Sequence, residues 1–140
     1  MSNRGAGEKP RTVRDVTENV AELLGGRRTI GAIPKTSLEA HEMLRSGLPA
    51  RALRHFVANL EHLNWNSAFE AALGMSQRTY QRHKAVASKP LSPDQTARTW
   101  KLVEILAKAT TILGTKEEAE RWLERPAIGL DGRRPIDLLA

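Results

Sequence analysis

The sequence predicts an all-α fold, and three features of its segments lead to that class. Apolar residues recur at helical spacing in most parts of the chain. Ser or Thr residues suited to N-capping stand before these segments, and glycines stand after several of them. The order of the segments predicts a helical N-terminal region with a helix-turn-helix, followed by a small helical domain.

Composition and charge narrow the class of protein. The 140 residues are 40% hydrophobic and 27% charged, as in an ordinary globular protein. Lys and Arg number 22 against 16 Asp and Glu, and this +6 balance favours a polyanionic partner. The sequence holds no cysteine, and no apolar run approaches the roughly 18 residues of a membrane span. We therefore expect a soluble, cytoplasmic protein.

Residues 1–35 are predicted to form a basic extension with one helix. Residues 1–10 are rich in Gly, Arg and Lys and are expected to be a disordered arm. Thr12 can cap a helix that runs to about Leu24, where two glycines end it. Residues 27–35 contain Gly and Pro and are interpreted as a linker, either a loop or one short extended piece.

Two helices are predicted between residues 36 and 63. Thr36 and Glu39 match a capping box, so a helix should run to about Ser46. Pro49 suits the first position of the next helix. Its apolar stripe predicts the central core helix, built on Leu53, Phe56, Val57, Leu60 and Leu63.

Residues 66–87 carry a helix-turn-helix pattern. A short alanine-rich helix, with Phe69 on its buried side, must stop at Gly74, where we expect a positive φ. Met75 can lie under the turn. Ser76 can cap the second helix, which would start there.

The second helix of this motif divides into two faces. Thr79, Tyr80 and His83 share the inward face, and the outward face consists of hydrogen-bond donors. Arg can bind a guanine edge, Gln an adenine edge and Lys a phosphate. DNA binding is therefore favoured over an αα-hairpin with a solvated basic face. The predicted DNA-binding residues are Ser76, Gln77, Arg78, Gln81, Arg82 and Lys84.

Three further segments are predicted after residue 91. Ser92-Pro93-Asp94-Gln95 opens a long helix that Gly114 ends. Its wide apolar arc suggests burial against the domain on one side and a partner or dimer mate on the other. Thr115 opens a short helix with Trp122, and residues 135–139 look like the first turn of another.

Taken in order, these segments resemble the antitoxins of the Xre/MbcA/ParS family, the partners of RES-domain toxins. The resemblance begins at about residue 42 and continues to the end of the chain. The matching residues are Gly47-Leu48-Pro49-Ala50, Ala72-Leu73-Gly74-Met75-Ser76 with Arg78-Thr79 and Arg82, Leu91-Ser92-Pro93-Asp94, Gly114 followed by Glu118-Ala119, Trp122-Leu123, and Gly132-Arg133-Arg134-Pro135-Ile136-Asp137-Leu138-Leu139.

The resemblance implies two domains and a function. Residues 36–90 would form the Xre-like helix-turn-helix domain that binds operator DNA, and residues 91–140 the toxin-binding domain. The chain would be a non-enzymatic antitoxin of a type II toxin–antitoxin system. It would repress its own operon and occlude the active site of a RES toxin that consumes NAD or transfers ADP-ribose. We expect the toxin-binding residues to be Trp122, Gly132, Arg133, Arg134, Pro135, Asp137, Leu138 and Leu139, although Trp122 by itself suits the antitoxin's own core.

Further expectations concern assembly and the ends of the chain. We expect a homodimer, because one helix-turn-helix covers one half-site, and a hetero-oligomer with the toxin. Family members usually continue beyond the Pro-Ile-Asp-Leu-Leu motif with another helix and an occluding tail, whereas this sequence stops at Ala140. The resemblance assigns no role to residues 1–35. Removing residues 127–140 is expected to release the toxin and to spare DNA binding.

Two other functional classes have less support. A helix-turn-helix regulator whose C-terminal half only dimerises, without a toxin partner, remains the alternative. An enzyme is not expected, because no phosphate loop, metal-ligand cluster or nucleophile–base spacing is recognisable. His55 and His62 lack ligand partners at suitable spacing, so neither a metal nor a cofactor is expected. The acidic group Glu117, Glu118 and Glu120 is interpreted as favourable charge at a helix start.

Overall fold

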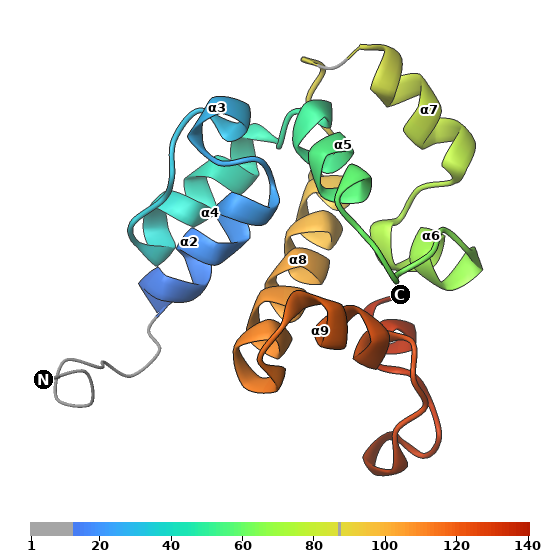
Figure 1. Cartoon of the computed structure of the whole chain (residues 1–140). Helices are drawn as coiled ribbons and strands as arrows, with labels where there is room; N and C mark the ends of the chain where they lie inside the picture. The colour runs from blue at the N-terminus through green and yellow to red at the C-terminus, as the bar shows by residue number, and fades with distance from the viewer. Residues whose placement is uncertain (1–12, 87) are drawn as a thin grey trace, which may run out of the picture.

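A computed structural model describes residues 13–86 and 88–140, and it shows an all-α protein (Figure 1). Within these residues there is no β-strand, and no helix is long and apolar enough to cross a membrane. In chain order the elements are α2 (Val13–Leu23), α3 (Arg27–Ile30), α4 (Ser37–Ser46), α5 (Ala50–Ala58), α6 (Ser67–Leu73), α7 (Gln77–Ala85), α8 (Pro93–Leu113), α9 (Lys116–Leu123), and the 3-10 helices η1 (Ile128–Leu130) and η2 (Pro135–Leu139).

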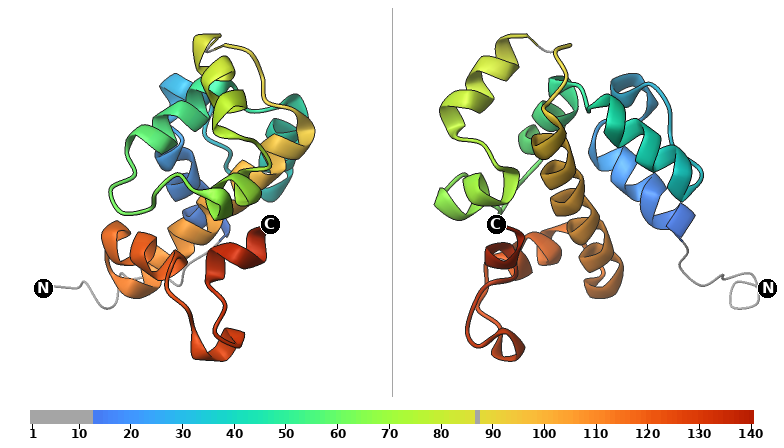
Figure 2. Two further views of the ribbon diagram at one scale, coloured as in Figure 1. Left: turned by 90° about the vertical axis from the view of Figure 1, so that its right-hand side faces the viewer. Right: turned by 180° about the vertical axis from the view of Figure 1, so that it is seen from behind.

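The long helix α8 is the axis of the fold (Figure 2). It opens with the predicted capping box, in which Ser92 Oγ accepts from Gln95 N at 3.0 Å and Gln95 Oε1 accepts from Ser92 N at 3.1 Å. Helices α2, α4, α6, α9 and η2 all pack against it. Its buried residues are Thr96, Thr99, Trp100, Leu102, Val103, Leu106, Ala107 and Ala109.

This packing bears on two expectations. The wide apolar arc of α8 is covered by the chain's own helices along most of its length, while Ile112 and Leu113 at its C-terminal end stay exposed, so the contact with a partner or dimer mate stays a prediction. The helix predicted from Pro49 to about Leu63 is shorter, since α5 ends at Ala58 and Pro49 is its N-cap. Helix α5 ends early because of a residue far along the chain. The Glu120 carboxylate accepts the N–H groups of residues 61–63, which therefore leave the helical hydrogen-bond pattern.

The N-terminal region is also more helical than predicted. Helix α2 ends as expected before two glycines of positive φ, and it packs against α8 and α4. The predicted linker contains the one-turn helix α3, in which Thr29 Oγ1 donates to Gly25 O at 3.2 Å. That local hydrogen bond favours a turn over the extended piece. The disordered arm and the Thr12 cap lie outside the described residues.

The C-terminal segment packs back on the helix-turn-helix. Thr115 caps α9 as predicted, accepting from Glu118 N at 3.1 Å. Residues 135–139 form the 3-10 helix η2, which packs against α6, α8 and α9. Ile136 has no exposed surface and belongs to the core. Removal of residues 127–140 would therefore take a core residue away from beneath α6, so this deletion cannot separate toxin binding from DNA binding.

Candidate functional site

The turn between α6 and α7 is built as the sequence predicts. Asn66 Oδ1 accepts from Phe69 N at 3.0 Å and caps α6. Gly74 ends this helix in the left-handed region, at φ 71° and ψ 28°. A Cβ on Gly74 would lie 2.5 Å from Arg98 Cδ, in a flexible side chain that can move, so the left-handed backbone conformation is what favours glycine here. Met75 is buried beneath the turn.

The start of α7 is held from two sides. Ser76 Oγ accepts from Thr79 N at 3.1 Å, the predicted N-cap. Glu70 Oε2, on α6, accepts from Gln77 N at 2.8 Å and from Trp65 Nε1 at 2.8 Å. These two hydrogen bonds, first that of Trp65 and then that of Gln77, lower the pKa of the Glu70 carboxyl. Glu70 therefore fixes α7 against α6, a role that the sequence analysis missed.

Aromatic side chains support the inner face of α7. Tyr80 is buried, and Thr79 and His83 are half-buried, which confirms the predicted inward set. The Trp65 ring lies 4.8 Å from the Phe69 ring and 5.0 Å from the Tyr80 ring, measured between centroids. Trp65 thus joins the two helices through ring contacts at favourable separation.

His83 lies at the edge of this inner face. Its Nδ1 is buried without a hydrogen-bond partner. Burial lowers the pKa of the imidazole, and the nearby charges of Lys89 and Arg82 lower it further. The ring is therefore held in its neutral form at neutral pH.

The outer face of α7 is polar and open. Ser76 and all five donors predicted to face outward are exposed, so the predicted orientation is confirmed, whereas their contact with DNA stays a prediction. None of them takes part in an ion pair within the described part of the chain. The five donors are Gln77, Arg78, Gln81, Arg82 and Lys84.

The predicted toxin-binding residues differ in how accessible they are. Gly132 and Arg133 are exposed, as expected for a contact turn. Arg134 and Asp137 are joined to each other, with Nη2–Oδ1 at 2.8 Å and Nε–Oδ2 at 3.0 Å. Pro135 is buried in the isolated chain, and its contact with the toxin stays a prediction.

The remaining predicted residues have partial exposure. Leu138 is 46% exposed, whereas Leu139 and Trp122 are half-buried and pack against the core. Leu123, next to Trp122, is fully buried and belongs to the protein's own core. Trp122 is therefore shared between the core and an open groove of about 190 Å³. The groove is lined by Ile105, Lys108, Ala109, Ile112, Leu113 and Trp122.

Two strongly exposed apolar side chains near the C-terminus, Ile112 and Ile128, were not among the predicted site residues. Ile128 is 99% exposed and Ile112 81% exposed. Single exposed apolar residues are ordinary, whereas several that gather in one region mark an interaction site. Of the six large exposed apolar residues in the described part of the chain, four lie after residue 111: Ile112, Leu113, Ile128 and Leu138. The sequence signal for Ile128 was an apolar residue within a Gly- and Pro-containing turn.

Glu120 has a structural role that differs from its interpretation as favourable charge at a helix start. It has no exposed surface, and Oε1 accepts from the backbone N–H groups of Glu61, His62 and Leu63 at 2.9, 2.7 and 2.9 Å. Lys116 Nζ donates to Glu120 Oε2 at 2.6 Å. Burial alone would raise the pKa of Glu120, but the hydrogen bonds from Lys116 and these backbone groups outweigh it and lower the pKa.

His62 has carboxylate neighbours that the sequence did not reveal. Glu117 Oε2 lies 3.9 Å from His62 Nε2, and Glu61, His62 and Glu117 offer ligand atoms within 4.8 Å of one another. Arg121 Nη2, however, lies 3.4 Å from the same His62 nitrogen. Arg121 thus shares the His62 nitrogen that would have to bind a metal.

Comparison with known families places both regions. Residues 39–104 match the model of the antitoxin Xre-like helix-turn-helix domain, and residues 108–140 match that of the antitoxin Xre/MbcA/ParS C-terminal toxin-binding domain. No curated protein matches the chain. The two ranges meet within α8, and together they describe an antitoxin with a DNA-binding domain and a toxin-binding domain. The chain belongs to the Xre/MbcA/ParS antitoxin family.

Proposed function

We propose that the chain is a non-enzymatic, cytoplasmic antitoxin that neutralises a RES-domain toxin and represses its own operon. The RES partner, with its consumption of NAD or transfer of ADP-ribose, follows from the resemblance of the C-terminal motifs. The observation that carries the proposal is the coincidence of the toxin-binding match at residues 108–140 with exposed apolar side chains in the same range.

The DNA-binding half of the proposal rests on α7. We infer that Arg78, Gln81 and Arg82 enter the major groove of the operator, with Ser76, Gln77 and Lys84 beside them. Support comes from their exposure, from the absence of competing ion pairs on these described side chains, and from the rigid attachment of α7 through Glu70 and Trp65.

The toxin-binding half rests on the lower end of the molecule in Figure 1. There η1 and its turn extend away from the helical body, and Ile128 lies on this projection with Arg133 nearby in sequence. An exposed apolar anchor with a flanking guanidinium is typical of an interface centre and its rim. We propose that this projection and the groove beside Trp122 contact the toxin and cover its active site.

An inhibition assay tests this function. The chain and the product of the adjacent gene are mixed, and NAD consumption is followed with increasing amounts of the chain. We expect a stable complex on gel filtration and full inhibition at a fixed ratio. If the neighbour consumes NAD and the chain neither binds nor inhibits it, the antitoxin function is contradicted. Operator binding in that case would favour the regulator without a toxin partner.

We also propose a homodimer on the DNA, because one recognition helix covers one half-site and two would lie about one DNA turn apart. Most of the apolar arc of α8 is buried within the chain. The proposal of a dimer therefore rests on half-site geometry. Sedimentation at micromolar concentration is expected to show dimers, with or without toxin. Monomers alone under both conditions would contradict it.

A further inference from the structure

Acidic residues are unevenly distributed along the chain. None of the Asp or Glu residues lies in residues 23–38, 43–60 or 71–93. Each stretch nevertheless carries several basic side chains. They are Arg27, Arg28 and Lys35 in the first, Arg45, Arg51 and Arg54 in the second, and Arg78, Arg82, Lys84 and Lys89 in the third.

The fold brings these three stretches to one end of the molecule. Helix α3 packs against α5, and α5 packs against α7. Arg51 Nε, on α5, donates to Thr29 O on α3 at 2.9 Å. Ala50 N, at the start of α5, donates to Lys89 O in the segment after α7 at 2.9 Å. Both α3 and the segment after α7 are therefore hydrogen-bonded to α5. Figures 1 and 2 show α3, α5 and α7 at the same end in every view.

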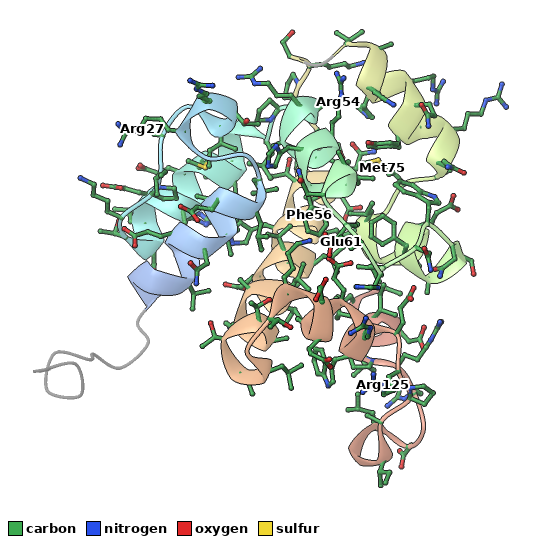
Figure 3. The ribbon with its side chains drawn as sticks, in the orientation of Figure 1. Arg27, Arg54, Phe56, Glu61, Met75 and Arg125 are labelled. Atoms are coloured by element: carbon green, nitrogen blue, oxygen red, sulfur yellow. The ribbon has the colours of Figure 1, made fainter. Side chains whose placement is uncertain are left out.

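The cations on α3, on α5 and in the segment after α7 are open to solvent and free of internal partners of opposite charge. Arg27, Arg28, Arg51, Arg54 and Lys89 are exposed, and we call this set the basic edge. None of the five belongs to an ion pair within the described residues. Figure 3 shows Arg54 on α5, between α3 and α7, and Arg27 on α3, on the side of α5 away from α7. Unneutralised like charges on one surface attract a polyanion.

The other flank of α7 lacks such groups. In helix-turn-helix proteins the first helix of the motif crosses the DNA backbone. Here that helix, α6, reads Ser-Ala-Phe-Glu-Ala-Ala-Leu and carries Glu70 but no Lys or Arg. Phosphates on either side of α7 would therefore meet cations on the α5 side and none on α6.

We propose that the basic edge binds the sugar-phosphate backbone of the DNA duplex, so that α3 and α5 extend the DNA-binding surface beyond α7. This inference rests on the proposed binding of operator DNA by α7. It gives a role to α3, which lies before residue 39 and hence outside the matched helix-turn-helix domain. Contacts of this kind add affinity and fix the orientation of the duplex without reading its sequence.

The test is the salt dependence of DNA binding by the full chain with the double variant Arg27→Ala/Arg28→Ala. Dissociation constants are measured for operator and random duplexes between 50 and 200 mM salt. Loss of two phosphate contacts should reduce the slope of log K against log salt by about 1.8. The ratio of the wild-type affinity to that of the double variant should then fall roughly tenfold between the lowest and the highest salt, equally for both duplexes.

Two matched variants serve as controls. Arg27→Lys/Arg28→Lys keeps the charges and should keep the wild-type slope. Arg125→Ala/Arg133→Ala removes the same charge from exposed residues of the C-terminal region, where Figure 3 places Arg125 at the opposite end, and should also keep it. A wild-type slope for Arg27→Ala/Arg28→Ala overturns the proposal, as does an equal fall with the Arg125 variant. The proposal is also overturned if Arg27→Ala/Arg28→Ala loses toxin binding while its salt slope stays that of the wild type.

The experiment separates this inference from the proposed function. If the wild type prefers operator over random duplex while the α3 variant behaves like the wild type, α7 binds DNA and the basic edge does not. If the wild type binds both duplexes equally and the α3 variant loses slope, the basic edge binds phosphates and the operator assignment fails. Wild type that binds neither duplex contradicts both.

Discussion

Among single residues, Arg78 and Arg82 offer the clearest test of α7 as the recognition helix. Both are exposed and have no ion-pair partner among the described residues. We predict that either Arg78→Ala or Arg82→Ala weakens operator binding by about 1–3 kcal/mol, because each removes a base or phosphate contact. A gel-shift titration at fixed salt measures this effect. Equal affinity of the wild type and the double variant would show that α7 is not the reader.

Glu120 allows a second residue-scale prediction, about stability. Glu120→Ala would leave three backbone N–H groups and Lys116 without their carboxylate. Breaking such a buried pair costs about 3–5 kcal/mol. The matched control is Glu117→Ala, because Glu117 is exposed on the same helix and its loss should change stability little. Urea unfolding compares the two, and equal midpoints would contradict the role of Glu120.

His83 predicts a pH dependence of stability. Its folded pKa lies below the unfolded value of about 6.5, because burial and two cations disfavour the charged ring. Protonation therefore favours the unfolded chain, and stability falls as pH drops below the unfolded pKa until the folded pKa is passed. His83→Gln should flatten this dependence between pH 7 and 5. A variant whose loss of stability over that range equals that of the wild type would refute the prediction.

At the scale of elements, η2 connects the toxin-binding region to the helix-turn-helix. Ile136 is fully buried, and η2 packs against α6 and α8. We predict that Ile136→Ala lowers the free energy of unfolding by about 2–5 kcal/mol, whereas Leu138→Ala, at a 46% exposed position, has a much smaller effect. Thermal unfolding of both variants checks this difference. Similar midpoints would mean that η2 contributes little to the common core.

Hydrogen bonds also connect the two matched regions. Glu120 binds residues 61–63, Lys116 Nζ donates to Asn59 O at 2.5 Å, and Asn66 Nδ2 donates to Glu124 Oε2 at 3.1 Å. Each contact joins α9 or the residue after it to the loop between α5 and α6. The DNA-binding and toxin-binding regions therefore share one core and are expected to unfold together.

Across the whole molecule, local signals in the sequence predicted the helix starts and stops well. Capping residues and glycines placed α4, α6, α7, α8 and α9 close to their observed bounds, because these signals act within a few residues. The outward face of α7 followed from helical periodicity alone.

Long-range contacts account for what the sequence did not show. The early end of α5 depends on Glu120, which lies 57–59 residues away from its partners. The burial of Pro135 and the covering of α8 depend on how the helices pack together. The pairing of Arg134 with Asp137 is local, yet it became visible only in the geometry. Exposure of Ile128 likewise required the fold.

The two proposed activities occupy different ends of the molecule, which gives the central claim its most direct measurement. Operator affinity and inhibition of NAD consumption are measured for two variants, Arg78→Ala/Arg82→Ala on α7 and Ile128→Asp/Arg133→Glu on the C-terminal projection. We predict that the first loses operator binding and still inhibits the toxin. The second should bind operator normally and inhibit weakly, because an interface anchor is replaced by a charge. If both variants lose the same activity, or if the Ile128 variant inhibits as well as the wild type, the account is contradicted.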